Sequence, residues 1–187
     1  MDFDKVIQKR ASIRGYSGKK PQIEKIIKAI EAANKAPTPG NLQLLSYTII
    51  EKPETIQKIA QACQQEFVQQ APFVVVVCSK PKHCERLYDK KGKIYLRQHA
   101  GAAIENFLLK IIDLGLSSCW VGAFSEVTLK TLLRIPEDID IEAVLPIGYK
   151  LVFDKTTQKR KPHLENRVFF EVYKNKHKYP YKKVGEH

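Results

Sequence analysis

The run Phe-Val-Val-Val-Val-Cys at residues 73–78 constrains the fold of this chain more than any other segment. Its apolar residues follow one another without the polar alternation that marks a strand with one solvated face. The run has the length of a strand and is too short to span a membrane. It therefore predicts a buried strand, and a chain of 187 residues can supply the sizeable core that such a strand requires.

The remaining pattern indicates helices and strands around that buried strand. Apolar residues at helical spacing predict helices over residues 3–10, 22–35, 54–66, 95–114 and 126–134. Further strands, the second of them short or a turn, are expected at 46–51, 118–121 and 141–150. We interpret 80–93 as a basic loop and 164–173 as an extended segment that covers its own sheet edge or extends a partner's sheet. We expect one α+β domain over 1–187, with a basic tail from about residue 174.

Composition and the cysteines exclude several classes of protein. The chain has no stretch of about 18 apolar residues, and its N-terminus lacks the apolar core of a signal peptide. We therefore expect a cytoplasmic protein without a membrane span. The four cysteines form no C-x-x-C pair, and the spacing of Cys78, His83 and Cys84 does not suit metal ligands. No metal site is expected, and the thiols should be reduced.

The chain carries a formal net charge of +12, from 32 basic and 20 acidic residues. The excess is concentrated at 80–93, with six Lys or Arg against two acids, and at 174–187, with five lysines against one acid. Such a field attracts phosphates, nucleotides or nucleic acid. We interpret both clusters as solvated surface and a loose tail, because we find no aromatic stacking motif with them.

Four separate segments carry residues suited to ligand chemistry. Arg10–Arg14 presents two guanidinium forks and a hydroxyl at alternating positions, which converge on one anion when the backbone is extended. Pro37–Gln43 combines prolines and a glycine with polar tips, which suits a ligand clamp or a plain turn. Gly115–Phe124 holds the single tryptophan beside a glycine, and Lys159–Pro162 can reach a phosphate. Taken singly, each segment is also explained as surface charge, a turn or core packing.

The order of these segments resembles that of the nitroreductase family of flavoenzymes. R-A-S-I-R-G-Y is similar to the family's R-x-S-x-R-x-[YF], and A-P-T-P-G-N-L-Q to its A-P-S-x-x-N-x-Q. H-A-G-A-A-I-E-N-F-L-L and the following G-L-S-S-C-W-V-G-A-F resemble its central helix and loop. L-P-I-G-Y-K with K-R-K-P resembles its last core strand and basic phosphate contact, so the resemblance covers about residues 3–165.

This resemblance implies an α+β fold with a central, mostly antiparallel sheet flanked by helices, in an intertwined homodimer with a C-terminal extension. It implies an FMN-dependent oxidoreductase that passes hydride from NAD(P)H through flavin N5 to a small-molecule acceptor, such as a nitroaromatic or quinone, in a ping-pong cycle. Catalytic side chains are not implied, since N5 carries the reaction. The alternatives are dehalogenation, dehydrogenation or flavin destruction on the same fold and, on charge alone, a basic nucleic-acid-binding dimer.

Carried over residue by residue, the resemblance implies the following contacts to FMN. Arg10 and Ser12 contact the phosphate and ribityl chain, with Arg160 as the second phosphate cation. Arg14 donates to N1 and the C2 carbonyl, where reduction collects negative charge. The other implied contacts are Ala11, the loop residues Trp120, Val121 and Gly122 near the ring, and the clamp residues Pro37, Thr38, Pro39, Asn41 and Gln43, which reach the flavin held mainly by the other subunit.

Two positions depart from the family pattern. Thr38 stands where serine is usual, which preserves the hydroxyl. Gln98 and His99 stand where many relatives have an acidic residue, and the sequence leaves open whether either one lines the pocket. The sequence defines neither the acceptor nor the choice between NADH and NADPH.

Overall fold

The computed structural model describes residues 1–152 and 163–176, and the chain divides into two compact units, Met1–Thr156 and Thr157–His187. Among the described residues, the helices of the first unit are α1 (Phe3–Lys9), α2 (Ile23–Ala33), α3 (Pro53–Cys63), α4 (Pro81–Tyr88), α5 (Lys90–Asp113) and α6 (Glu126–Leu133). Its strands are β1 (Leu45–Ile50), β2 (Phe73–Ser79), β3 (Ser117–Ser118) and β4 (Asp140–Gly148). In these two ranges, no helix is both long and apolar enough to cross a membrane.

The strands form one sheet in the order β1-β2-β4-β3, and every neighbouring pair is antiparallel. The α+β class and the antiparallel sheet predicted from the sequence are thus confirmed. Every residue of β2 is buried. Val75 and Val77 belong to one apolar cluster, whereas Val74 and Val76 belong to another on the opposite side. The uninterrupted valines are therefore explained by a strand that has a covered surface on both faces.

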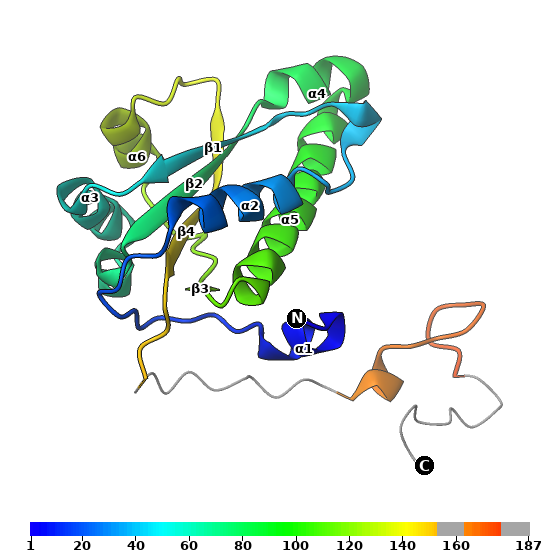
Figure 1. Cartoon of the computed structure of the whole chain (residues 1–187). Helices are drawn as coiled ribbons and strands as arrows, with labels where there is room; N and C mark the ends of the chain where they lie inside the picture. Colours follow the sequence, from blue (N-terminus) through cyan, green and yellow to red (C-terminus); the bar gives the residue numbers. More distant parts are fainter. Residues whose placement is uncertain (153–162, 177–187) are drawn as a thin grey trace, which may run out of the picture. The chain divides into compact units, whose positions relative to one another are not determined.

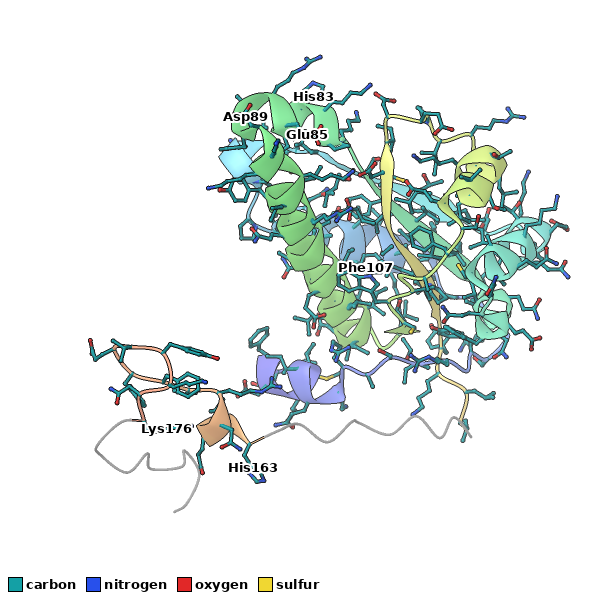
Figure 2. All side chains as sticks on the ribbon, turned by 180° about the vertical axis from the view of Figure 1, so that it is seen from behind. His83, Glu85, Asp89, Phe107, His163 and Lys176 are labelled. Atoms are coloured by element: carbon teal, nitrogen blue, oxygen red, sulfur yellow. The ribbon has the colours of Figure 1, made fainter. Side chains whose placement is uncertain are left out.

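Helices cover both faces of the sheet (Figure 1). The apolar stripe of α2, with Ile26, Ala29 and Ala33 buried, packs with α5 on one face. Phe107, in the C-terminal half of α5, is fully buried in this layer (Figure 2). Helices α3 and α6 pack on the other face. This three-layer arrangement leaves the loops at the ends of the strands to form ligand sites.

Residues 80–93 are helical, so the prediction of a basic loop there is wrong. Helix α4 begins with Pro81 in its first turn, and α5 begins at Lys90 rather than at residue 95. Pro81 and Cys84 are buried and give α4 an inner side. Because lysine and arginine are strong helix formers, their abundance was a poor reason to expect a loop.

The prediction of an extended segment at 164–173 is also wrong. Described by itself, the second unit has a 3-10 turn at Leu164–Asn166, and its described residues, 163–176, contain no strand. Glu171 and Lys174 have φ of 64° and 66°, a left-handed conformation that interrupts extended backbone. The rings of Phe169 and Tyr173 meet edge to face at 5.2 Å between centroids. Two of the aromatic residues of this segment thus contact each other, whereas Leu164 and Val172 are exposed.

Candidate functional site

The segment after α1 is held extended by contacts with other strands. The Ile13 N–H donates to the Ser118 carbonyl oxygen at 3.1 Å. Tyr16 forms a bridge just beyond β4, and its hydroxyl donates to the Ile13 carbonyl oxygen at 2.8 Å. A Cβ at Gly148 would lie 3.2 Å from the Tyr16 ring and 2.9 Å from Pro72, so only glycine leaves this space open. The three predicted anion contacts therefore project from a fixed backbone.

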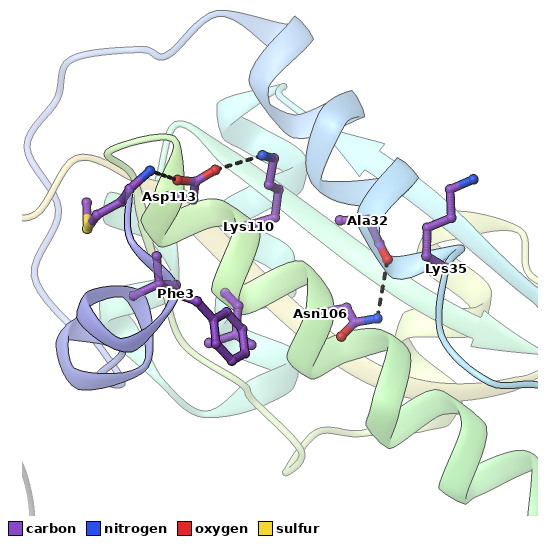
Figure 3. Close-up of a pocket in the computed structure, with 9 residues that line it drawn as sticks. Phe3, Ala32, Lys35, Asn106, Lys110 and Asp113 are labelled. Atoms are coloured by element: carbon purple, nitrogen blue, oxygen red, sulfur yellow. Dashed lines mark hydrogen bonds and ion pairs between the residues drawn. The ribbon is translucent and has the colours of Figure 1, made fainter.

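The N-terminal residue, which precedes α1, is bonded to α5 (Figure 3). The Asp113 carboxylate accepts hydrogen bonds from the Met1 amine at 2.6 Å and from Lys110 Nζ at 2.7 Å. The bond from Lys110, followed by the bond from the amine, lowers the pKa of Asp113 to about 2. Just after α1, Arg10 Nε lies 3.4 Å from a carboxylate oxygen of Glu105 on α5. The positive charge of Arg10 is thus partly neutralised by Glu105.

This segment meets the loop after β3 in a narrow cleft. The lining residues come from the two segments and from α5, and they are Arg10, Ala11, Ser12, Leu108, Ile112, Ser118, Cys119 and Trp120. The cleft encloses only about 10 Å³, so a ligand would lie against its mouth. Ser118 Oγ is buried there without a hydrogen-bond partner among the described residues. An unpartnered buried hydroxyl costs about 1–3 kcal/mol, which makes this atom a candidate ligand contact.

The two arginines of this segment act on the pKa of the Cys119 thiol. Burial raises the pKa of this thiol, while Arg14, the Ser12 hydroxyl and Arg10 each act to lower it. Arg10 and Ser12 line the cleft together with Cys119, and the charge of Arg14 acts on the same thiol. Arg14 is itself exposed, and its guanidinium carbon lies 5.8 Å from the centroid of the Phe67 ring.

The backbone beside Trp120 has one N–H already in use. Val121 N–H donates to the Val144 carbonyl oxygen at 3.0 Å, and Val144 N–H returns a bond of the same length. Gly122 follows on the surface, and its N–H has no protein partner among the described residues. Trp120 is 41% exposed and is therefore not a core residue. Of the backbone N–H groups of Val121 and Gly122, only that of Gly122 is free to donate to a ligand.

The clamp segment turns sharply at a 3-10 turn, Pro39–Asn41. Gly40 and Asn41 have φ of 57° and 58°, a left-handed conformation that glycine and asparagine adopt most readily. A Cβ at Gly40 would lie 2.8 Å from the Tyr88 hydroxyl, so glycine lets α4 approach the clamp. Asn41 and Gln43 are exposed and point to no partner within the described residues.

The clamp lies on a groove of about 410 Å³ that it shares with α4 and α5. Its lining residues are Pro37, Thr38, Pro39, Tyr88, Tyr95, Gln98, His99 and Ala102. The rings of Tyr88 and Tyr95 meet edge to face at 5.3 Å between centroids. His99 is 5% exposed, and its Nδ1 has no hydrogen-bond partner among the described residues. Burial lowers the pKa of His99, so the imidazole is neutral at pH 7.

Seven of the predicted contacts line one of two sites on this chain, and the lining of both sites lacks Arg14, Asn41, Gln43, Val121 and Gly122. The cleft brings together Arg10, Ala11, Ser12 and Trp120, whereas the groove holds Pro37, Thr38 and Pro39, and no residue lines both. The predicted Arg160 lies outside the described residues. In the part of the chain that the structure describes, no cluster of His, Cys, Asp and Glu could hold a metal ion.

Several residues of the two sites were not selected from the sequence. Tyr88 and Tyr95 fell in or beside the predicted basic loop, and their seven-residue separation gave a signal only if helices were expected there. Ser118 lay in the selected segment Gly115–Phe124, but no neighbouring residue marked it as a ligand contact. Gln98 and His99, whose role the sequence left open, both line the groove.

Comparison with known proteins identifies the family. The Nitroreductase family model matches residues 7–67 and 57–149. The chain therefore belongs to the Nitroreductase family, as the sequence motifs predicted, and it is an oxidoreductase of that family.

Individual relatives agree with this assignment. A protein of Archaeoglobus fulgidus, provisionally named NADH dehydrogenase/NAD(P)H nitroreductase, is 34% identical over 150 residues, which is 78% of this chain and 83% of the relative. A crystal structure from Clostridium acetobutylicum, provisionally named NADH oxidase, has 29% identity and a TM-score of 0.76, covering 90% of this chain and 99% of that one. Iodotyrosine deiodinase bound to FMN and 3-iodo-L-tyrosine shares the fold, with a TM-score of 0.78 at 20% identity, covering 92% and 100% of the two chains.

Proposed function

We propose that this chain is an FMN-dependent oxidoreductase that takes hydride from NAD(P)H and delivers it to a small acceptor, such as a nitroaromatic or quinone, in a ping-pong cycle. The observation that carries the proposal is that Arg10 and Ser12 line the cleft in which Ser118 Oγ lacks a partner, with the charge of Arg14 acting on the Cys119 thiol of the same cleft. Family membership and the FMN bound by a deiodinase of the same fold support the choice of cofactor. FMN, when bound, would supply N5 as the atom that receives and releases hydride.

The cleft residues would bind the phosphate and ribityl end of the cofactor. Arg10 would hold the phosphate through charge-assisted hydrogen bonds, together with Arg160, which the sequence motif assigns to this role. Ser12 and Ser118 offer hydroxyls beside the same cleft, and Ala11 leaves room for the chain to approach. The free hydroxyl of Ser118 is the feature that fits best, because a ligand oxygen would satisfy a buried polar atom.

The ring end would be oriented by Arg14, Gly122 and Trp120. Arg14 would place a fixed positive charge beside N1 and the C2 carbonyl, where reduction collects negative charge. The Gly122 N–H is free to donate to N5 or O4, whereas the Val121 N–H is held by Val144 and would contribute only packing. Trp120 presents an exposed apolar surface next to this loop.

The clamp would act on the flavin of a second subunit. Pro37, Thr38 and Pro39 line a groove that shares no residue with the cleft, and Asn41 and Gln43 follow them in the same exposed segment, which a homodimer with composite sites would explain. We propose that 1–187 works as one functional domain in which the C-terminal residues help to hold the partner. Each dimer would then carry two equivalent cofactor sites.

The proposal is tested by titrating apoprotein with FMN in two matched variants. Ser118→Ala should weaken FMN binding by about tenfold, the equivalent of roughly one hydrogen bond. Ser117→Ala changes the preceding buried serine of β3, whose hydroxyl does not line the cleft, and should leave the affinity unchanged. A preparation that binds no FMN, or a Ser118→Ala variant with unaltered affinity, would contradict the placement of the cofactor.

A further inference from the structure

The groove between the clamp and α5 has a chemistry of its own. None of the eight residues that line it carries a formal charge at neutral pH, although the chain has a net charge of +12. Two tyrosine rings form one side, and Pro37 and Pro39 add apolar surface. A volume of about 410 Å³ lies in the range of small-molecule sites. The groove therefore suits a flat, uncharged molecule.

His99 supplies the polar contact that such a groove needs for selectivity. It lies on α5 one helical turn after Tyr95, so both side chains belong to the same face of the helix. The Nδ1 atom is buried and has no partner among the described residues. Tyr88 comes from the neighbouring α4 and closes the groove beside Gly40. A ligand that hydrogen bonds to His99 would satisfy a buried group that the protein leaves unpaired.

We propose that this groove is the acceptor-binding part of the site and that His99 is its specificity-determining residue. The occupant is an uncharged planar aromatic molecule, with its ring against Tyr88 and Tyr95 and an oxygen substituent hydrogen bonded to the imidazole. A ring that carries a carboxylate is disfavoured, because no cation lines the groove to offset the desolvation of the charge. The inference rests on the proposed function, since it takes the Thr38 side of the groove as the side that meets the flavin.

The test is calorimetric titration of the purified chain, loaded with FMN where it binds FMN, with two probes that share one ring. These probes are 4-nitrobenzyl alcohol, which is uncharged, and 4-nitrobenzoate, which is an anion. We expect the uncharged probe to bind at least about tenfold more tightly. His99→Leu should weaken its binding by about tenfold through loss of the hydrogen bond, whereas His99→Asn, which keeps a polar side chain, should restore most of it.

The matched control is His83→Asn. His83 is an exposed histidine on α4 that does not line the groove, and its replacement should not change either affinity (Figure 2). In turnover assays, the KM for the uncharged probe should rise in His99→Leu while kcat changes little. The FMN content should equal that of the unmodified chain.

The outcomes separate the two proposals. If the chain retains no FMN, the proposed function fails, while titration of the same protein still decides which ligand class the groove accepts. If FMN is retained but His99→Leu binds the uncharged probe as tightly as before, the role of His99 is overturned. Equal or tighter binding of the carboxylate probe would overturn the assigned ligand class.

Discussion

The cleft and the groove differ in how they are built and in what they can hold. The cleft is made from extended backbone with two arginines nearby, whereas the groove is made from two helices and a turn and contains no formal charge. A permanent anionic ligand such as a phosphate is best held by fixed cations. A ligand that must enter and leave at every turnover is better served by an uncharged aromatic surface.

Their backbones differ in a related way. The cleft segment is held by a strand-like bridge, a backbone bond to Ser118 and the packing of Tyr16 on Gly148. The groove depends on the junction between α4 and α5, where Asp89 has φ 49° and ψ −137° at the tip seen in Figure 2. A residue other than glycine in such a region costs on the order of 1–3 kcal/mol. The strained residue Asp89 thus lies next to Tyr88 of the groove, and the cleft segment is held by hydrogen bonds and packing.

The largest effect is expected at the cation of the cleft. Arg10→Ala should lose about 2–4 kcal/mol of FMN affinity, by analogy with the truncation of a buried charge pair. Glu105→Gln is the matched control, because it removes the acidic partner of Arg10 and should leave FMN affinity equal or higher. Titration of apoprotein measures both. An Arg10→Ala variant that binds FMN normally would remove the main support for the cleft as the phosphate site.

A smaller effect, on the free energy of unfolding, is expected at the contact between the two helices that line the groove. A Cβ at Gly92 would lie 2.5 Å from the Cys84 carbonyl oxygen, so Gly92→Ala should push α4 away from α5 and destabilise the fold by about 1–3 kcal/mol. Gly101→Ala, on the same helix with open space at its Cβ position, should stabilise by roughly 0.5–1 kcal/mol. Urea unfolding gives both values. Equal stabilities would contradict the close approach at Gly92.

The sequence predicted the parts of this molecule that depend on local pattern. The valines of β2 and the apolar stripe of α2 specify their elements through spacing alone, and the alternation in the R-x-S-x-R segment brings Arg10 and Ser12 to one cleft. The pairing of Val121 with Val144, which uses the Val121 N–H, depends on residues far apart in the chain. Tyr88 and Tyr95 meet only because the chain reverses at Asp89. The first contact has no local signal, and the second had one only if helices were expected at 80–93.

Replacement of Arg14 tests the ring end of the proposed cofactor site without removing the cofactor. Arg14→Met should bind FMN and should lower its two-electron potential by about 30 mV, the equivalent of roughly 1.4 kcal/mol, because a positive charge beside N1 and the C2 carbonyl is lost. Spectroscopic titration against a redox dye measures the shift. A wild-type potential in this variant would mean that Arg14 faces elsewhere.

The smallest effect is expected at the anchor of α1. Asp113→Asn should cost less than about 1 kcal/mol, because the ion pairs are partly exposed and screened. The folded pKa of about 2 lies below the ordinary 3.8, so the carboxylate stabilises the fold above pH 3.8 and loses this contribution as the pH falls toward 2. Unfolding of both proteins at several pH values should show a difference that narrows in acid. A difference that grew in acid would contradict the assigned ion pairs.

The measurement that tests the account most directly is light scattering combined with quantitation of bound flavin. The two separate sites on one chain predict a dimer that retains two FMN, with a melting temperature that rises as FMN is added. Truncation before Leu164 should weaken both dimerisation and flavin retention. A monodisperse monomer that retains one FMN per chain would contradict the composite site, and with it the roles proposed for Thr38 and Asn41.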